Sequence, residues 1–327
     1  MDQDEPMRLK PEALTSRPAS DETKAPEPSP LDTLVAQETA RAAAAETQPR
    51  DQMSDESDFK TFYGLKENPF SDSVNPSFFY KTGCHELAFI RMMLAIRNDV
   101  SLGLVSGPSG SGKTLISQML LQNLDPSQYQ PAVILVSPAM SKTSLLREIL
   151  HELGVEAPGG PFVRAQDLLN LLQSYVIDLY HEGKKLVLII DESHFLTADS
   201  LHILRTVSNI EVPEHKLSTC ILFAEDRFLK RLAHPSFESL RNRIYLHGEL
   251  GPLDVDDCRQ YIKFRLMRAG RMHDLFDEGA VAAVQELSTG ICRRINKIGL
   301  LSLLEGTLRG KPTITADIVE ANASGLR

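Results

Sequence analysis

One octapeptide of the sequence reads Gly107-Pro108-Ser109-Gly110-Ser111-Gly112-Lys113-Thr114. It fits the pattern Gly-x-x-x-x-Gly-Lys-[Ser/Thr] of a phosphate-binding loop, or P-loop. The apolar run 100–105 before it predicts a strand and residues 114–124 after it predict a helix, which is the order that this loop requires. Its glycines let successive backbone N–H groups turn inward around phosphates, and the helix N-terminus adds partial positive charge. We therefore expect residues 107–114 to bind the phosphates of a nucleotide.

Four side chains are expected to act around those phosphates. Lys113 is expected to neutralise the β and γ oxygens, and the hydroxyl of Thr114 to hold Mg2+. Further along the chain, the apolar run 186–190 predicts a buried strand that ends at Asp191 and Glu192. A parallel strand brings the residues at its C-terminal end to the ligand crevice, so Asp191 is placed as a second Mg2+ partner. Glu192 is placed to orient or deprotonate a water molecule that attacks the γ-phosphate.

The predicted nucleotide is ATP and the predicted reaction is its hydrolysis. A water-activating carboxylate favours hydrolysis over phosphoryl transfer to a metabolite, because a kinase does not need one. GTP is disfavoured, because the single Asn-Lys pair of the chain, in Asn296-Lys297-Ile298-Gly299, lacks the Asp that reads guanine.

Strand and helix patterns alternate through the middle of the chain. This alternation predicts an α/β fold, with the parallel sheet of a P-loop NTPase covered by helices on both faces. The helix at 86–96 has an apolar stripe of Leu87, Ile90, Met93 and Leu94. The expected strands are 100–105, 132–136, 186–190, 218–223 and 244–246, and the expected helices are 86–96, 114–124, 144–153, 165–181 and 200–209.

Composition divides the chain into three parts. Residues 1–58 hold seven prolines, no glycine, no aromatic residue and a net charge of 6 − 14 = −8, which predicts a disordered tail. Residues 59–250 are predicted to form the nucleotide-binding domain. From a boundary near Gly251 and Pro252, the pattern is all-helical, with helices expected at 254–269, 277–287, 291–308 and from 315, so residues 251–327 are expected to form a small helical lid domain.

The overall composition excludes several classes of protein. The net charge is −9 over 327 residues, and only −1 of it falls outside residues 1–58. The rest of the chain therefore lacks the strongly basic surface of a nucleic-acid coat protein. The longest aliphatic run, 186–190, is far shorter than the roughly 20 residues of a membrane span. The four cysteines and nine histidines form no disulfide framework or zinc motif, and we expect reduced, buried thiols in a soluble, intracellular protein.

Two further stretches open the folded part of the chain, namely Phe62-Tyr63-Gly64-Leu65-Lys66-Glu67-Asn68-Pro69-Phe70 and Asn75-Pro76-Ser77-Phe78-Phe79-Tyr80. With the P-loop and the acid pair, they resemble the AAA+ ATPases, and more narrowly the ExeA-like group named for general secretion pathway protein A. The resemblance covers about residues 59–310. It implies a nucleotide bound between the sheet and the lid. It also implies homo-oligomers in which an arginine of one subunit reaches the γ-phosphate of its neighbour.

The resemblance also assigns roles to arginines. Leu240-Arg241-Asn242-Arg243-Ile244 looks like the family's ending before the last strand, so Arg243 is the expected arginine finger, with Arg241 as the alternative. Gly290-Ile291-Cys292-Arg293-Arg294-Ile295-Asn296 is similar to the lid motif, in which Arg293 takes the place of the arginine that contacts the γ-phosphate. Cys292 stands where the family usually has proline.

The chain departs from the family pattern at two more positions. Glu225 follows the strand at 218–223 where a Gln is usual, and a carboxylate there repels phosphate unless it is protonated, paired or turned away. His194 stands where the family has Gln in Asp-Glu-Ala-Gln. His194 could sense phosphate, contact a neighbouring subunit, or lie at the surface. Slow hydrolysis, or use of ATP mainly as an assembly switch, therefore stays open.

Three functions are weighed on this basis. The first is an oligomeric ATPase that drives or times the assembly of a partner complex, a secretion or envelope component, in the cytoplasm or at the inner membrane through that partner. The second is a DNA-associated regulator of the transposition or replication-initiation type, which the local basic residues of the lid favour. The third is an ATP-binding scaffold without turnover. The basic residues are Lys263, Arg265, Arg268, Arg271, Arg293, Arg294 and Lys297.

Overall fold

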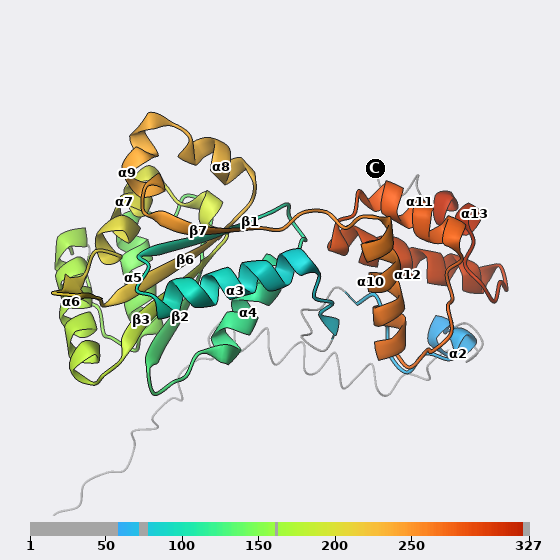
Figure 1. Ribbon diagram of the computed structural model, residues 1–327, viewed down its shortest axis with the longest axis horizontal. Coiled ribbons are helices and arrows are strands. Elements are labelled where there is room, and N and C mark those ends of the chain that lie inside the picture. Colours follow the sequence, from blue (N-terminus) through green and yellow to red (C-terminus); the bar gives the residue numbers. More distant parts are fainter. Residues whose placement is uncertain (1–57, 72–77, 161–162, 323–327) are drawn as a thin grey trace, which may run out of the picture. The chain divides into compact units, whose positions relative to one another are not determined.

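A computed structural model describes residues 58–71, 78–160 and 163–322 (Figure 1). Five parallel strands form one sheet in the order β2-β3-β6-β1-β7. Every strand runs in the same direction, so the C-terminal ends of all five meet at one edge of the sheet. The strands are β1 (Leu102–Ser106), β2 (Tyr129–Leu135), β3 (Lys185–Asp191), β6 (Ser218–Ala224) and β7 (Ile244–Glu249).

Helices cover both faces of this sheet. On one face, Leu186, Leu188 and Ile190 of β3 join a hydrophobic core with residues of α5, α6 and α7. On the other face, Val187 and Ile189 join a second core with α3 and α4. A strand that is buried on both faces needs a continuous apolar run, and 186–190 supplies it. The predicted fold class is therefore confirmed. These helices are α3 (Gly83–Arg97), α4 (Lys113–Asn123), α5 (Lys142–Glu152), α6 (Ala165–His181) and α7 (Ala198–Val207).

The helix predicted at 86–96 forms as α3, but most of its apolar stripe does not face the core. Leu87, Ile90 and Leu94 are 48%, 45% and 47% exposed, whereas Ala88 and Met92 are fully buried. The reason is close packing, because α3 lies so near the sheet that small or flexible side chains fit best. A Cβ built on Gly248 of β7, for example, would lie 2.7 Å from the Cβ of Ala88.

Several short elements were not predicted, because they are too short to show a period in the sequence. A hairpin of β4 (Glu211–Val212) and β5 (His215–Lys216) follows α7. Between β6 and β7 the chain forms α8 (Arg227–Leu232), η4 (Pro235–Phe237) and α9 (Glu238–Arg241). The 3-10 turn η3 (Ser193–Phe195) follows β3. This turn matters below, because it carries one of the site histidines.

After β7 the described chain is helical, as expected. The C-terminal helices are α10 (Val255–Arg268), α11 (Glu278–Ser288), α12 (Cys292–Leu308) and α13 (Ala316–Ala321). Asp254 and Asp277 cap α10 and α11, since their side chains accept from the backbone N–H groups of Asp257 and Ala280.

The aromatic segment that opens the described chain packs against the C-terminal helices. Tyr63 of α2 (Phe59–Tyr63) and Phe70 lie in the same hydrophobic core as Leu253 and Ile298. The prediction that residues 59–250 form the nucleotide-binding domain does not anticipate this packing, because composition shows that the segment is apolar but not which core it joins. The C-terminal helical core is therefore built from two distant stretches of the chain.

Arg265 of α10 connects these stretches and is a buried cation. Its guanidinium donates to the carbonyl oxygens of Pro69 (2.5 Å) and Ser71 (3.0 Å) and lies 5.0 Å from the ring centroid of Phe78. Arg271 likewise donates to the carbonyl oxygen of Tyr63 at 2.7 Å. Two of the basic residues that favour a nucleic-acid contact thus stabilise the fold instead.

Some expectations lie outside the described residues. The predicted disordered tail is among them except for Asp58, as are residues 75–77 of the second N-terminal stretch. The four cysteines are free thiols; Cys220 and Cys258 are buried, whereas Cys84 and Cys292 are partly exposed. In the described part of the chain, no helix combines the length and the apolar character that a membrane span requires.

Candidate nucleotide site

The P-loop joins the C-terminal end of β1 to the first turn of α4. Gly110 and Gly112 have φ angles of +79° and +102°, which side-chain-bearing residues rarely adopt. Gly107 lies against Leu250, whose carbonyl oxygen would be 2.7 Å from a Cβ at position 107. The glycines of the motif are therefore required by the backbone path, and α4 begins at Lys113 with its N-terminus at the loop.

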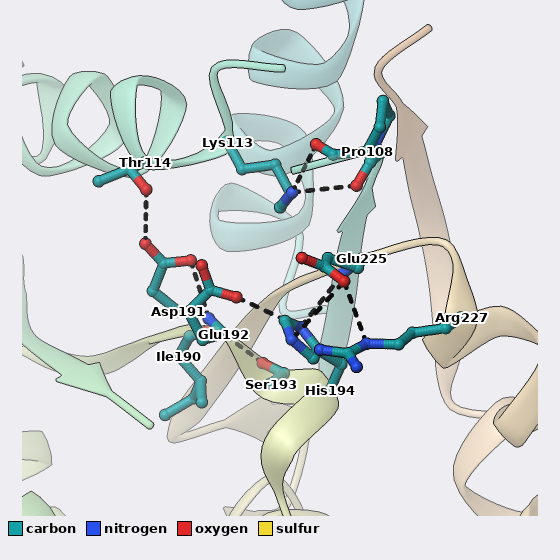
Figure 2. Close-up of polar contacts among 11 residues, drawn as sticks. Pro108, Lys113, Thr114, Ile190, Asp191, Glu192, Ser193, His194, Glu225 and Arg227 are labelled. Atoms are coloured by element: carbon teal, nitrogen blue, oxygen red, sulfur yellow. Dashed lines mark hydrogen bonds and ion pairs between the residues drawn. The ribbon is translucent and has the colours of Figure 1, made fainter. Parts of the chain in front are cut away.

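Lys113 is the cation of this loop. Its side chain is only 5% exposed, and Nζ donates to the carbonyl oxygens of Gly107 (3.0 Å) and Pro108 (2.9 Å) (Figure 2). Burial lowers the pKa of Lys113, and the carboxylates of nearby acids oppose that shift. The positive charge therefore lies inside the loop, near the carboxylates of Glu192, Glu225, Asp191 and Asp226.

Thr114 and Asp191, the two residues expected to hold Mg2+, are in direct contact. The hydroxyl of Thr114 donates to Oδ2 of Asp191 at 2.9 Å, and Oδ1 of Asp191 accepts from the backbone N–H of Glu192 at 2.8 Å (Figure 2). Both side chains stand at the C-terminal edge of the sheet, one at the start of α4 and one at the end of β3. A hydroxyl and a carboxylate oxygen are hard ligands of the kind that Mg2+ prefers.

These residues fit a magnesium-bound triphosphate. The hydroxyl of Ser111 is buried and has no hydrogen-bond partner among the residues that the structure describes. A polar group buried without a partner is costly, and a phosphate oxygen would satisfy it. The loop thus offers a buried ammonium, a buried hydroxyl and an inward-turned backbone, with an oxygen pair for the cation beside it.

Glu192 has a strained backbone. Its φ and ψ angles are 56° and 33°, in the left-handed region that residues other than glycine rarely occupy. Such strain costs on the order of 1–3 kcal/mol and tends to occur at functional sites. Burial raises the pKa of the Glu192 carboxyl, as does the charge of Asp191. The strained backbone and the raised pKa both mark Glu192 as a candidate functional residue.

His194 and Glu225, the two departures from the family pattern, lie next to each other. The backbone N–H of Glu225 donates to Nδ1 of His194 at 3.3 Å, and Nδ1 is also 3.3 Å from Oε2 of Glu192 (Figure 2). The side chain of His194 is 2% exposed, which excludes the surface position, one of the three alternatives that the sequence leaves open for it. Glu225 forms an ion pair with Arg227, whose Nε is 3.0 Å from Oε2. The carboxylate is therefore paired, as the sequence requires of an acid near phosphate.

Within the described residues, Glu192, His194 and Glu225 also form the only group of three or more His, Cys, Asp or Glu side chains that could hold a metal ion together. One ligand atom from each lies within 4.8 Å of the others. Burial, and then the charge of Arg227, lowers the pKa of His194. The ring is neutral in this arrangement, because Nδ1 accepts from the backbone N–H of Glu225 and so carries no proton.

Comparisons with known proteins agree with this geometry. Residues 96–232 match the model of a family described as an AAA domain. General secretion pathway protein A of Aeromonas hydrophila is 31% identical over 272 residues, which cover 82% of this chain and 49% of that relative. The chain is an AAA+ protein of the ExeA-like group. It spans about half the length of the curated relative that it matches.

Solved structures agree on the fold of this AAA+ chain. Cdc6p of Pyrobaculum aerophilum superposes with a TM-score of 0.60 at 14% identity, over 79% of this chain and 70% of that one. The ORC2 protein of Aeropyrum pernix, solved as ADPNP–ADP complexes, gives 0.56 at 17% identity, over 79% and 71%. At such identities the likeness establishes the shared architecture alone.

Two arginines expected from the AAA+ pattern lie at different places. The backbone N–H of Arg293 donates to the carbonyl oxygen of Gly110 at 3.2 Å, and the charge of Arg293 acts on the Glu192 carboxyl. Arg243 instead precedes β7, whose first residue is paired with Leu102 at the start of β1. The length of β1, about 13 Å, separates that end from the P-loop. Within one chain, Arg243 therefore does not join Lys113; it donates to the side chain of Asn209.

One residue of the AAA+ site was not foreseen. His85 of α3 is buried, and its Nε2 lies 2.8 Å from the carbonyl oxygen of Ser111 in the P-loop. Because a carbonyl can only accept, Nε2 carries the proton and Nδ1 accepts from the hydroxyl of Thr82 at 2.5 Å. His85 thus fixes the loop from a neighbouring helix. No local motif in the sequence indicates this contact, because it joins residues 26 positions apart.

Proposed function

We propose that this protein binds ATP with Mg2+ and hydrolyses it to ADP and phosphate. The observation that carries the proposal is the contact of Thr114 with Asp191 at 2.9 Å, beside the buried ammonium of Lys113. A structural turn rich in glycine needs neither a buried lysine nor an acid from a second strand at its edge. Both are needed to bind a magnesium-chelated triphosphate.

Each residue of the site has a separate role in this proposal. The P-loop amides and Lys113 bind the phosphates, while Thr114 and Asp191 hold the cation. When bound, Mg2+ neutralises charge on the phosphate oxygens. Glu192 orients the attacking water and accepts its proton. Arg293, next to Gly110, contributes a positive charge from the lid side.

The test of this proposal is direct. The purified protein is expected to retain ATP in the presence of Mg2+, to lose most of that affinity in EDTA, and to release phosphate. Equilibrium binding of a fluorescent ATP analogue and a phosphate-release assay measure these properties. A protein that binds no ATP would refute the proposal, and one that binds without releasing phosphate would favour the scaffold function.

We further propose that the chain acts as a homo-oligomer with Arg243 reaching the site of a neighbour. Arg243 lies at the sheet end opposite to its own P-loop, so it cannot act on a nucleotide bound by its own chain. The variant Arg243→Ala is expected to keep ATP affinity within about threefold but to lose at least about 100-fold in hydrolysis.

Mixing variants distinguishes this role from a structural one. Arg243→Ala subunits retain an intact P-loop, and Lys113→Met subunits retain Arg243, so phosphate release should reappear when the two inactive proteins are mixed. Arg241→Ala is the matched control, since Arg241 donates to the carbonyl oxygens of Leu232 and Ala233. The assignment is contradicted if Arg243→Ala alone is fully active. It is also contradicted if Arg241→Ala, rather than Arg243→Ala, is the variant that is inactive alone and regains activity when mixed with Lys113→Met.

For the biological role, we propose that ATP binding times the assembly of a partner complex, with the protein in the cytoplasm or attached to the inner membrane by that partner. The support is the relative named general secretion pathway protein A. The DNA-associated alternative is less well supported, because Arg265 and Arg271 of its basic group hold the N-terminal segment. Binding to duplex DNA with a steep salt dependence would reverse this preference.

A further inference from the structure

Four side chains form a continuous row that begins at Glu192, the residue proposed to activate the attacking water. The row runs from Glu192 at the end of β3, through His194 of η3, to Glu225 at the end of β6 and Arg227 of α8 (Figure 2). Along it, His194 Nδ1 is 3.3 Å from Oε2 of Glu192, and His194 Nε2 is 3.9 Å from Oε2 of Glu225. His194 is thus the single side chain of the row that faces both acids.

The hydrogen-bond chemistry fixes the direction of the His194 ring. The backbone N–H of Glu225 can only donate, so Nδ1 accepts in that bond and the neutral ring carries its proton on Nε2. Nε2 is buried, has no hydrogen-bond partner among the described residues, and points towards the carboxylate of Glu225. Both ring nitrogens are therefore directed at residue 225, one at its backbone and one at its side chain.

The charges around Lys113 explain why the carboxylate of Glu225 must be held in place. Lys113 has several carboxylates around it, and Glu225 is among those that act on it most strongly. An unrestrained carboxylate at position 225 could turn to the lysine and occupy the place of phosphate oxygens. The ion pair with Arg227 and the proton on Nε2 of His194 both draw it the other way.

We propose that His194 is a positioning residue that draws the carboxylate of Glu225 away from Lys113, so that an acid at position 225 is compatible with turnover only while His194 is present. The proposal rests on ATP hydrolysis as the proposed function. It joins two of the departures from the ExeA-like pattern into one unit, because the two residues touch.

A double-mutant cycle with a conservative substitution tests this role. His194→Ala is expected to lower kcat/KM for ATP by about 10- to 100-fold, chiefly through a higher KM, because the released carboxylate of Glu225 competes with phosphate oxygens for Lys113. His194→Gln places an amide NH2 group near Nε2, from which it can donate to Glu225, and is expected to recover most of that loss. In a Glu225→Gln background, the cost of His194→Ala should shrink by about fivefold or more, since contacting residues are energetically coupled.

Several outcomes would overturn the proposal. These are an unchanged kcat/KM in His194→Ala, a His194→Gln variant as impaired as the alanine variant, and effects of His194→Ala and Glu225→Gln that simply multiply. If His194→Ala does not fold, the cycle is run with His194→Asn, which keeps an acceptor near Nδ1 but lacks the proton on Nε2, against Glu225→Gln under the same criterion of coupling. His273→Gln, at an exposed position after α10, is the control and should match wild type. Absence of hydrolysis in wild type refutes the proposed function, whereas an active wild type without coupling refutes only the role of His194.

Discussion

Replacement of Lys113 by methionine is expected to weaken the binding of magnesium ATP by about 100-fold or more. In the structure, the ammonium is buried in the P-loop between two carbonyl oxygens and a set of carboxylates. Methionine keeps the length of the side chain but removes the positive charge. The phosphates would then meet the charges of Asp191, Glu192 and Glu225 without compensation.

Equilibrium binding of a fluorescent ATP analogue measures this effect, and the thermal unfolding midpoint checks that the variant folds. The matched control is Lys142→Met, because Lys142 lies on the surface, where its Nζ is 3.3 Å from Asp199. A surface ion pair of that kind contributes little, so this variant should bind ATP as wild type does. Wild-type affinity in Lys113→Met would show that residues 107–114 are not the nucleotide site.

Replacement of Glu192 by glutamine is expected to lower the rate of phosphate release by at least about 100-fold while ATP affinity stays the same or rises. An amide has nearly the shape of the carboxyl but cannot accept a proton from water. The NH2 group of the amide, unlike the carboxylate, can donate to Nδ1 of His194, which lies 3.3 Å from Oε2 in the wild-type structure. The backbone at position 192 should therefore keep its place, and the variant should accumulate with ATP bound.

Glu182→Gln is the matched control for this substitution, since Glu182 is exposed and 3.8 Å from Lys184. Phosphate release and retained nucleotide are measured on both proteins. Equal turnover in Glu192→Gln and wild type would mean that another group activates the water or that the chain does not hydrolyse ATP. A pull-down with the trapped variant in ATP is also the most informative way to identify the proposed partner.

The sequence predicts the central part of the site because its motifs are local. The P-loop spans eight consecutive residues, and the short apolar run 186–190 indicates a strand buried on both faces. The parallel order of strands then brings Asp191 to Thr114, and the structure has that contact at 2.9 Å. The same reasoning could not find His85, which reaches the P-loop from α3 without any motif.

Other features depend on packing that one sequence does not encode locally. His194 and Glu225 each stand out as departures from a family pattern, but only the fold shows that they touch. Leu87, Ile90 and Leu94 have the spacing of a buried stripe, yet the close approach of α3 to the sheet turns Ala88 and Met92 inward. A period in the sequence establishes a helix, whereas the space left by its neighbours decides which side is buried.

The packing of Tyr63 and Phe70 against the C-terminal helices determines the order in which the protein can fold. Residues 58–71 are synthesised before all five strands, and α10 to α13, with which they pack, are synthesised after them. The sheet with its helices is therefore inserted, in the sequence, between the two halves of a smaller hydrophobic core. It can fold on the ribosome before the second half of that core has been synthesised. Shortening the chain at Phe59 or at α13 would consequently damage the same core from opposite ends.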